Sequence, residues 1–374
     1  MSEPVRAAQV VGKMVGGGLE AVVMNYYRHI DRNRYQFDFI VDSDSTLVPA
    51  EEIESLGGRV IEVPPYQKQP SNSRALEQLF RQEKYLIVHS HMNALSVFPL
   101  HAAAQAGVPI RIAHSHSTSG RGEYARNLLK AILRTQSNHY PTDRLACSRL
   151  AGDWLFGTNV PYTVIHNAID LQQYAFDPAK RGKVRQELGI GEKTFVVGNI
   201  GRLTEQKNQQ YLIEAFANML PERPDSALVI AGMGPLEEKL KSFVHEIGME
   251  QWVHFVGQRS DADALYSAFD VFCLPSLYEG LPVVGVEAQA SGVPCIFSTD
   301  VTDEVILTRG ACMLNNKLAP EEWAKALLKL PLADSNATRC ADGNLLKGFD
   351  ITHEVKCLEQ VYTECLSRLQ KGGA

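Results

Sequence analysis

The sequence lacks the features of a membrane-spanning or secreted protein. No uninterrupted apolar run among its 374 residues approaches the roughly 18 residues that a membrane-spanning helix needs. The N-terminus, Met1–Pro4, has no cationic stretch followed by an apolar core, so we expect no signal peptide. Any contact with a membrane is therefore expected to be peripheral.

A basic surplus and a cysteine pair are also missing. The net charge is −6, whereas a dedicated nucleic-acid binder usually carries excess positive charge, so we expect no nucleic-acid partner. The seven cysteines are odd in number and include no CxxC pair. This pattern suits a reducing cytoplasm and argues against a disulfide framework or a zinc site. We expect a cytoplasmic protein.

The sequence does contain a regular alternation of short β-branched runs and longer amphipathic stretches, which is typical of parallel βαβ units. The first predicted strands are Ala7–Val11, Phe37–Asp42, Arg59–Val63, Leu86–Ser90 and Ile110–His114, with helices Leu19–Ile30, Arg74–Gln82 and Ala94–Ala106. The later strands are Phe195–Ile200, Ala227–Ala231, Val253–Val256, Val271–Leu274 and Cys295–Ser298, with helices Asn208–Leu220, Pro235–Ile247, Ala262–Phe269 and Val283–Ala290.

These elements predict an α/β fold of two doubly wound, Rossmann-like domains with parallel sheets. The strand ends of the two domains are expected to surround one interdomain cleft. We place the N-terminal domain at residues 1–170 and the C-terminal domain at 171–351. The polar stretch Ala175–Glu192 is interpreted as a hinge. The tail 352–374 has apolar residues at helical spacing, so it is expected to form a packed helix.

Two carboxylates eight residues apart, Glu279 and Glu287, form the sharpest chemical signal. Glu279 follows the strand Val271–Leu274, and Glu287 lies about a turn and a half inside the next predicted helix. Carboxylates accept hydrogen bonds from vicinal diols, so the pair suits sugar hydroxyls. Taken alone, a solvated loop glutamate and an exposed helix glutamate explain the pair equally well.

Two cations, Arg202 and Lys207, flank the start of the helix after the strand Phe195–Ile200. Cationic side chains and free backbone amides at a helix N-terminus suit a diphosphate. The alternative is a pair of solvated surface cations, which is common for any Arg/Lys pair. The position at a strand end favours the diphosphate.

The chain resembles the retaining glycosyltransferases of family 4, which have two facing Rossmann-like domains in the GT-B architecture. The motifs that carry the resemblance are Gly16-Gly17-Gly18-Leu19-Glu20, His114-Ser-His116, Val164-Ile-His-Asn167-Ala-Ile-Asp170, Gly201-Arg202…Lys207-Asn208, Ala231-Gly232-Met-Gly234-Pro235 and Glu279…Glu287 followed by Ala288-Gln-Ala-Ser-Gly292-Val-Pro294. The resemblance spans nearly the whole chain and is most specific from Val164 to Pro294. It implies that the C-terminal helix, 352–374, packs back on the first domain.

The resemblance implies a role for each matching residue. Arg202 and Lys207 would hold the donor diphosphate, Glu279 the hydroxyls of the transferred sugar, and Glu287 the ribose. The resemblance also implies that a histidine at the end of a first-domain strand approaches the reaction centre; His116 fits this place better than His114. The implied catalytic residues are His116, Arg202, Lys207 and Glu279, and the donor-binding set adds Gly17, Gly18, Gly280, Leu281, Val283 and Glu287.

Two further patterns suggest other chemistry. The pairs His89-Ser-His91 and His114-Ser-His116 each place both rings on one face of a strand, which a metal could use. No aspartate-rich metal motif accompanies them, and the family needs no ion, so we expect neither a metal nor another cofactor. The loop Gly232-Met-Gly234 resembles a dinucleotide fingerprint, but Glu237 occupies the third glycine position.

The predicted function is transfer of a sugar, with retention, from a nucleotide diphosphate donor to a hydroxyl acceptor. A UDP-sugar is favoured as the donor. By analogy, the acceptor is a sugar or lipid-linked sugar in bacterial capsule, exopolysaccharide or lipopolysaccharide synthesis. A nucleotide-sugar 2-epimerase and a catalytically silent, nucleotide-sugar-binding partner subunit are the alternatives.

Residues 121–149 carry a local net charge of +4. Leu128, Leu129, Ile132 and Leu133 lie among the cations at helical spacing, so the segment can rest on an anionic bilayer at the inner face of the membrane. An ordinary buried helix with solvated flanking arginines is an equal alternative. Co-sedimentation with anionic vesicles, before and after Arg126, Lys130 and Arg134 become Glu, distinguishes the two.

Overall fold

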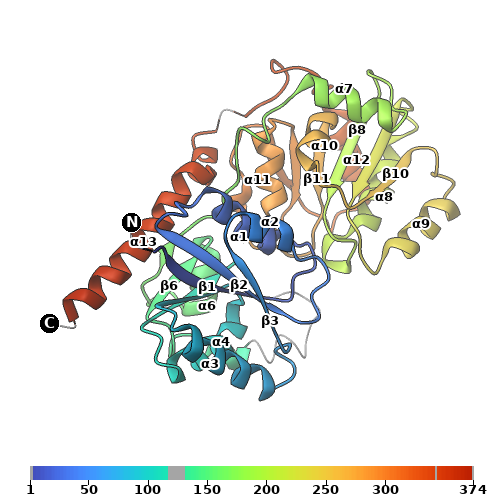
Figure 1. The fold of residues 1–374 in the computed structure, drawn as a ribbon. Helices are drawn as coiled ribbons and strands as arrows, with labels where there is room; N and C mark the ends of the chain where they lie inside the picture. The colour runs from blue at the N-terminus through green and yellow to red at the C-terminus, as the bar shows by residue number, and fades with distance from the viewer. Residues whose placement is uncertain (1–2, 117–130, 342, 373–374) are drawn as a thin grey trace. The chain divides into compact units, whose positions relative to one another are not determined.

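The computed structural model describes residues 3–116, 131–341 and 343–372. The chain divides into two compact units, residues 1–168 with 351–374, and residues 169–350. Each unit contains a parallel sheet with helices packed on it (Figure 1).

The described residues of the first unit form a seven-stranded parallel sheet in the order β3-β2-β1-β4-β5-β6-β7. Its strands are β1 Val5–Gly12, β2 Tyr35–Asp42, β3 Arg59–Val63, β4 Ile87–Ser90, β5 Ile110–Ser115, β6 Asp143–Ala146 and β7 Thr163–Val164. Its helices are α1 Gly18–His29, α2 Ala50–Ser55, α3 Ser71–Glu83, α4 Val97–Gln105, α6 Arg149–Phe156 and α13 Ile351–Gly372. A short 3-10 turn, η1 Asn93–Ser96, precedes α4, so the predicted helix Ala94–Ala106 has two parts. Helix α13 packs against α1.

The second unit has a six-stranded parallel sheet among its described residues, in the order β10-β9-β8-β11-β12-β13. The strands are β8 Phe195–Ile200, β9 Ser226–Ala231, β10 Val253–Gly257, β11 Val271–Leu274, β12 Cys295–Ser298 and β13 Ala311–Leu314. The helices are α7 Pro178–Glu187, α8 Gln209–Met219, α9 Glu237–Glu246, α10 Ala262–Ala268, α11 Val283–Ala290 and α12 Pro320–Leu328, and the 3-10 turns are η2 Glu205–Lys207, η3 Asp303–Val305 and η4 Leu346–Phe349. The fold class predicted from the sequence, two α/β units with doubly wound parallel sheets, is confirmed.

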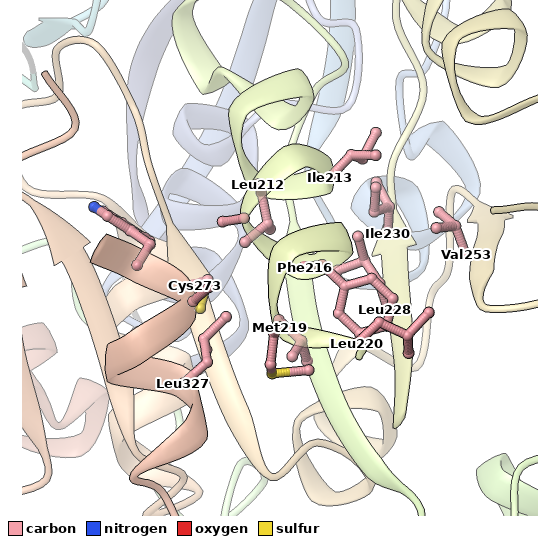
Figure 2. Packing of buried hydrophobic residues seen from close by; sticks show 14 of the residues in the cluster. Leu212, Ile213, Phe216, Met219, Leu220, Leu228, Ile230, Val253, Cys273 and Leu327 are labelled. Carbon is pink, nitrogen blue, oxygen red and sulfur yellow. The ribbon is translucent and has the colours of Figure 1, made fainter. Parts of the chain in front are cut away.

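Helix α8 forms the centre of the core of the second unit (Figure 2). Its apolar residues recur at helical spacing, so one face of the helix is continuously apolar: Leu212, Ile213, Phe216 and Met219. This face packs on Leu228 and Ile230 of β9, Cys273 of β11 and Leu327 of α12 (Figure 2). The packing fixes the start of α8, and therefore the loop between β8 and α8, against the sheet.

The predicted hinge, Ala175–Glu192, is wrong for most of its length, because residues 178–187 form helix α7. Asp177 caps this helix by accepting hydrogen bonds from the amides of Ala179 and Lys180, and Pro178 occupies the first helical position. The helix packs against α10 and buries Arg181 and Arg185. The sequence pattern did not reveal this helix, because Val184 is its one buried apolar residue and the other two buried residues are charged.

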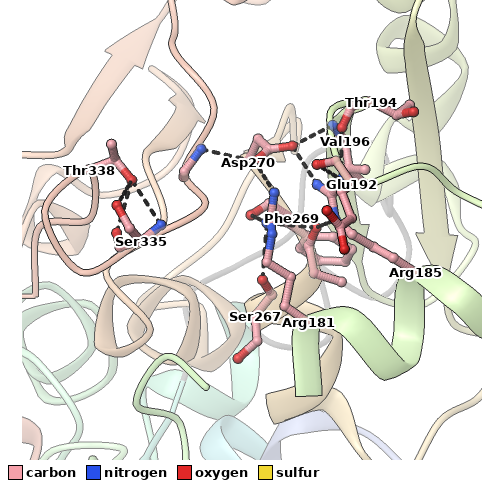
Figure 3. A network of polar contacts seen from close by, with 12 residues as sticks. Arg181, Arg185, Glu192, Thr194, Val196, Ser267, Phe269, Asp270, Ser335 and Thr338 are labelled. Atoms are coloured by element: carbon pink, nitrogen blue, oxygen red, sulfur yellow. Dashed lines mark hydrogen bonds and ion pairs between the residues drawn. The ribbon is translucent and has the colours of Figure 1, made fainter. Parts of the chain in front are cut away.

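Those arginines belong to a buried polar network around Asp270 (Figure 3). Asp270 Oδ1 accepts hydrogen bonds from Arg181 and the amide of Ala333, and Oδ2 accepts from Arg185 and the amide of Val196. Asp270 is completely buried, so losing it would leave uncompensated buried charge, at a cost of about 3–5 kcal/mol. The network ties α7 and the start of β8 to the end of α10.

Candidate functional site

The order of strands in the second sheet places the candidate site at the carboxyl ends of β8 and β11. Strand β8 lies in the middle of the sheet, with β9 and β10 on one side and β11, β12 and β13 on the other, so the strand order reverses next to β8. Ligands of doubly wound sheets bind in the crevice at such a reversal, outside the carboxyl ends of the strands. Arg202 and Lys207 follow β8, and Glu279 follows β11. The structure therefore brings these three predicted residues to one edge of one sheet.

The loop after β8 presents its two cations differently. Arg202 is exposed, and its guanidinium makes no hydrogen bond or ion pair with any residue that the structure describes. The Lys207 side chain lies close over Gly201, where an added Cβ would approach its Cε to 3.2 Å. Its ammonium Nζ is 2.6 Å from Glu279 Oε1. Both side chains of this ion pair are largely but not wholly buried, so a ligand can reach them.

Glu279 lies on the loop between β11 and α11. Its Oε1 also accepts a hydrogen bond of 3.2 Å from the Ser276 hydroxyl. Helix α11 begins at Val283, and Pro282 is its N-cap without a side-chain hydrogen bond. Uncapped amides at a helix N-terminus favour an anion. Gly280 and Leu281, which the sequence assigns to donor binding, are buried in the same turn.

Hydrogen bonds clamp the loop that carries Lys207 to the loop that carries Glu279. The Leu277 amide donates to the Gln206 carbonyl at 2.8 Å, and Gln206 Nε2 donates to the Tyr278 carbonyl at 2.9 Å. Asn208 and Asn316 each donate to the Pro275 carbonyl at 3.2 Å. Sequence reasoning missed Gln206 and Asn316 as parts of the site, because no local pattern marks contacts between residues 72 and 41 positions apart.

Glu287 is buried inside α11, and each carboxylate oxygen is held by a tyrosine. Oε1 accepts from the Tyr174 hydroxyl at 3.0 Å, and Oε2 accepts from the Tyr266 hydroxyl at 2.8 Å. Burial raises the pKa of the Glu287 carboxyl, and the two tyrosine hydrogen bonds oppose this shift. Each carboxylate oxygen can accept a second hydrogen bond, so the carboxylate can also receive a hydroxyl from a ligand. Sequence reasoning missed both tyrosines.

The glycines of the loop after β9 have a packing role. An added Cβ at Gly232 would lie 2.0 Å from the Gly201 carbonyl oxygen, and one at Gly234 would lie 2.3 Å from the Leu203 carbonyl oxygen. The Leu203 amide donates to the Met233 carbonyl at 3.0 Å, which joins this loop to the one after β8. The glycines therefore allow two loops to approach closely at the site.

In the first unit, the strand order reverses between β1 and β4. The glycine loop follows β1: Gly16 has φ of +76°, Gly17 is the N-cap of α1, and Gly18 is its first residue. Glu20 Oε1 accepts a hydrogen bond of 2.8 Å from the Val15 amide, which holds the loop against α1. Because no side chain caps α1, its first amides are available to an anion.

His116 lies directly after β5 and is buried, and both of its ring nitrogens have partners. Nδ1 is 2.9 Å from Asn167 Oδ1, and Nε2 is 2.9 Å from His91 Nδ1. The His116 amide donates to Asn93 Oδ1 at 2.7 Å. Burial lowers the pKa of His116 to about 4, against the effect of its hydrogen bond with Asn167, so the ring is neutral at pH 7.

His89, His91 and His114 form a cluster whose nitrogen atoms lie within 4.8 Å of one another. Burial lowers the pKa of all three rings well below the ordinary value, which would suit neutral metal ligands. However, both nitrogens of His89 and of His91 already have hydrogen-bond partners within the protein. The expectation of a site without metal stays a prediction.

The first part of the basic segment predicted to contact a membrane, residues 121–130, lies outside the described residues, and with it Arg121, Arg126, Leu128, Leu129 and Lys130. Of the remainder, Ile132 is exposed and Leu133 is buried in the core of the first unit. Contact with an anionic surface stays a prediction. Among the residues that the structure describes, no helix is both long and apolar enough to cross a bilayer.

The fold defines the class of the protein. The Anabaena protein HepE in complex with UDP-glucose superposes with a TM-score of 0.78 at 20% identity, over 96% of this chain and 99% of that one. WaaG, a glycosyltransferase involved in lipopolysaccharide biosynthesis, gives 0.68 at 14% identity, over 94% and 95%. The two parallel-sheet units thus have the architecture of GT-B glycosyltransferases.

Sequence comparison gives the family. Residues 16–173 match the model of "Glycosyltransferase Family 4", and residues 180–342 match "Glycosyl transferases group 1". The putative glycosyltransferase EpsF of Bacillus subtilis is 33% identical over 371 residues, 96% of each chain. The UDP-Gal:alpha-D-GlcNAc-diphosphoundecaprenol alpha-1,3-galactosyltransferase of Escherichia coli is 30% identical over 78% of each. The chain belongs to the family 4 glycosyltransferases.

Proposed function

We propose that the protein transfers a hexose from a UDP-sugar to a hydroxyl of a sugar or lipid-linked sugar, with retention of the anomeric configuration. The observation that carries the proposal is the pairing of Lys207 with Glu279 at 2.6 Å, beside the exposed Arg202 and the uncapped start of α11. One edge of the sheet thus offers cations and amides for a diphosphate together with a carboxylate for sugar hydroxyls.

Each residue has a proposed part in the reaction. The acceptor hydroxyl attacks the anomeric carbon while the nucleotide diphosphate leaves. Arg202, Lys207 and the backbone N–H groups of Gly280, Leu281 and Val283 at the start of α11 stabilise the negative charge that grows on the leaving diphosphate. Glu279 orients the sugar, and Glu287 accepts a hydrogen bond from the ribose. Gly17 and Gly18 offer amides to the phosphates, and His116 lies at the reacting sugar.

The choice of UDP and of the acceptor has support from relatives. The name of the Escherichia coli relative gives UDP-Gal as its donor and a diphosphoundecaprenol-linked sugar as its acceptor, and the Anabaena neighbour was crystallised with UDP-glucose. A further relative, from Rhizobium meliloti, is named as a mannosyltransferase of lipopolysaccharide core biosynthesis. We therefore propose a cytoplasmic role in bacterial capsule, exopolysaccharide or lipopolysaccharide synthesis, with the acceptor at the inner face of the membrane.

We expect UDP-sugars to raise the melting temperature of the protein more than GDP-sugars do. A bound ligand stabilises the folded state by mass action, by about 2.7 kcal/mol at a concentration 100 times its Kd. The measurement is a thermal-shift screen of UDP- and GDP-sugars, with the Lys207→Ala variant as the control that should lose the shift. A larger shift with GDP-sugars would reject the proposed base.

Two alternatives are tested by incubation with donor, first without an acceptor and then with acceptors. A nucleotide-sugar 2-epimerase would convert the donor into an equilibrium mixture with its 2-epimer, whereas a transferase would leave most of the donor unchanged. A silent partner subunit would bind the donor and show no turnover with any acceptor. The cations and carboxylates at one sheet edge favour transfer, because a subunit that only binds has no need of them all.

A further inference from the structure

A continuous series of hydrogen-bonded side chains crosses the interior of the first unit. We call it the histidine chain; its members, in order, are Asn167, His116, His91, Gln9, Tyr362, His89 and His114, and all are buried. The successive contacts measure 2.9, 2.9, 2.8, 3.1, 2.8 and 3.1 Å. Tyr362 comes from α13, so the chain links the C-terminal helix to His116.

Every histidine in the chain turns its Nδ1 towards the Asn167 end. His116 Nδ1 faces Asn167, His91 Nδ1 faces His116, His89 Nδ1 faces Tyr362, and His114 Nδ1 faces His89. A neutral imidazole donates through one nitrogen and accepts through the other. A tyrosine hydroxyl also donates once, and an amide presents its oxygen on one side and its nitrogen on the other. If one member donates a hydrogen bond to its neighbour, that neighbour must therefore donate to the following member in the same direction.

The side-chain amides of Asn167 and Gln9 both present an oxygen atom, which can only accept a hydrogen bond, to the same pair of histidines. Asn167 Oδ1 and Gln9 Oε1 both face the pair His116–His91. Three contacts, between Asn167 and His116, between the two histidines, and between His91 and Gln9, therefore each need one proton. Two neutral imidazole rings supply two protons. A third proton would make one ring a cation, which burial disfavours. The oxygen and nitrogen of a side-chain amide are distinguished by their hydrogen-bond partners. Rotating the amide group of either Asn167 or Gln9, so that its oxygen and nitrogen change places, leaves one proton in each contact.

Turning Asn167 is the better solution. Its Nδ2 then donates to His116 Nδ1, and every later hydrogen bond points the same way, towards His114. His114 consequently carries its proton on Nε2, the one ring nitrogen of the chain with no hydrogen-bond partner among the described residues. Burial lowers the pKa of His114, and the backbone of Ile165 opposes this shift, which indicates an acceptor near the ring. Hydrogen bonds in the opposite direction would leave His114 Nε2 unprotonated, with a lone pair in place of the proton.

We propose that the histidine chain is polarised in one direction, so that its four histidines share one tautomer, and that His91, Gln9 and Tyr362 are positioning residues for His116. Hydrogen bonds that point the same way strengthen one another, which fixes the His116 ring more firmly than its two direct partners would. The proposed role in the reaction rests on the proposed function, in which His116 lies at the transferred sugar. The polarity of the chain does not depend on it.

The first test is the tautomer of each histidine, read from ¹⁵N NMR of the full-length protein labelled at histidine. We expect His89, His91, His114 and His116 all to be neutral at pH 7 and protonated on Nε2. Nδ1–H in all four would still support a polarised chain, with its direction reversed. A mixture of tautomers, or a charged ring, would overturn the proposal.

The second test removes one link that does not touch His116. Tyr362→Phe keeps the ring packing and deletes the hydroxyl between Gln9 and His89. Tyr35→Phe is the matched control, because the Tyr35 hydroxyl is also buried against α13, at 2.8 Å from Thr363 Oγ1, but lies outside the chain. We expect Tyr362→Phe to shift the His116 ring resonances and to lower kcat about tenfold with little change in donor KM, as for a small misplacement.

These readouts separate the two claims. Unchanged His116 resonances in Tyr362→Phe would overturn the chain, whether or not the protein transfers sugar. Shifted resonances with kcat equal to that of Tyr35→Phe would overturn the positioning role alone. If the wild-type protein showed no transfer with any donor, the proposed function would fail, and the NMR results would still decide the polarity of the chain.

Discussion

Lys207→Ala and Arg202→Ala are each expected to lower kcat about a hundredfold or more while the protein stays folded. Removing one preorganised contact to a developing negative charge commonly costs about 3–4 kcal/mol in the transition state. Both side chains lie at the carboxyl end of β8, and Lys207 already pairs with a carboxylate in the space where a phosphate is proposed. The measurement is steady-state transfer with a saturating UDP-sugar.

The control for these variants is Lys239→Ala. Lys239 is an exposed lysine of α9 near the same loop, and its ammonium lies at the long distance of 3.9 Å from Glu205 Oε1. Its loss should leave kcat within about twofold of the wild type, since exposed pairs contribute little. Near-normal turnover in Lys207→Ala or Arg202→Ala would remove the assignment of that residue to the diphosphate.

Glu279→Gln and Glu287→Gln are expected to fail in different ways. Glu279 lies on the loop beside Lys207, so its substitution should lower kcat about tenfold to a hundredfold. Glu287 is buried in α11 between two tyrosines, so its substitution should mainly raise donor KM, by about tenfold, as for the loss of a charged hydrogen bond.

The matched control is Glu205→Gln, because Glu205 is an exposed carboxylate on the loop after β8. Steady-state kinetics with varied donor distinguish the two effects. The reverse pattern, with kcat lost in Glu287→Gln and KM raised in Glu279→Gln, would mean that the sugar and ribose ends of the donor have been exchanged.

Local patterns were enough to predict the elements that build the site of the second unit. The strand Val271–Leu274 and the helix Val283–Ala290 have the bounds expected from the sequence, since Pro275 follows the strand and Pro282 and Gly292 flank the helix. Glu279 and Lys207 were each predicted to follow the carboxyl end of a strand, and the structure places them in contact. This succeeded because strand ends of a parallel sheet gather at one edge whatever the side-chain details.

Contacts between distant residues could not be predicted in this way. Tyr362 and His89 are 273 residues apart, and Tyr174 and Glu287 are 113 apart, and no spacing rule connects them. Helix α7 was missed for a different reason, because two of its three buried residues are the arginines that pair with Asp270 and only Val184 is apolar. Its start could have been found, since Asp177 followed by Pro178 is a helix N-terminus signal.

The most direct test of the proposed function is the stereochemistry of transfer. The purified protein would be incubated with a UDP-sugar and a lipid-diphosphate-linked sugar, while UDP release is measured and the anomeric proton of the product is observed by NMR. We predict UDP release that depends on the acceptor, and a product with the same anomeric configuration as the donor. A product of inverted configuration, or donor consumed equally fast without acceptor, would contradict retaining sugar transfer.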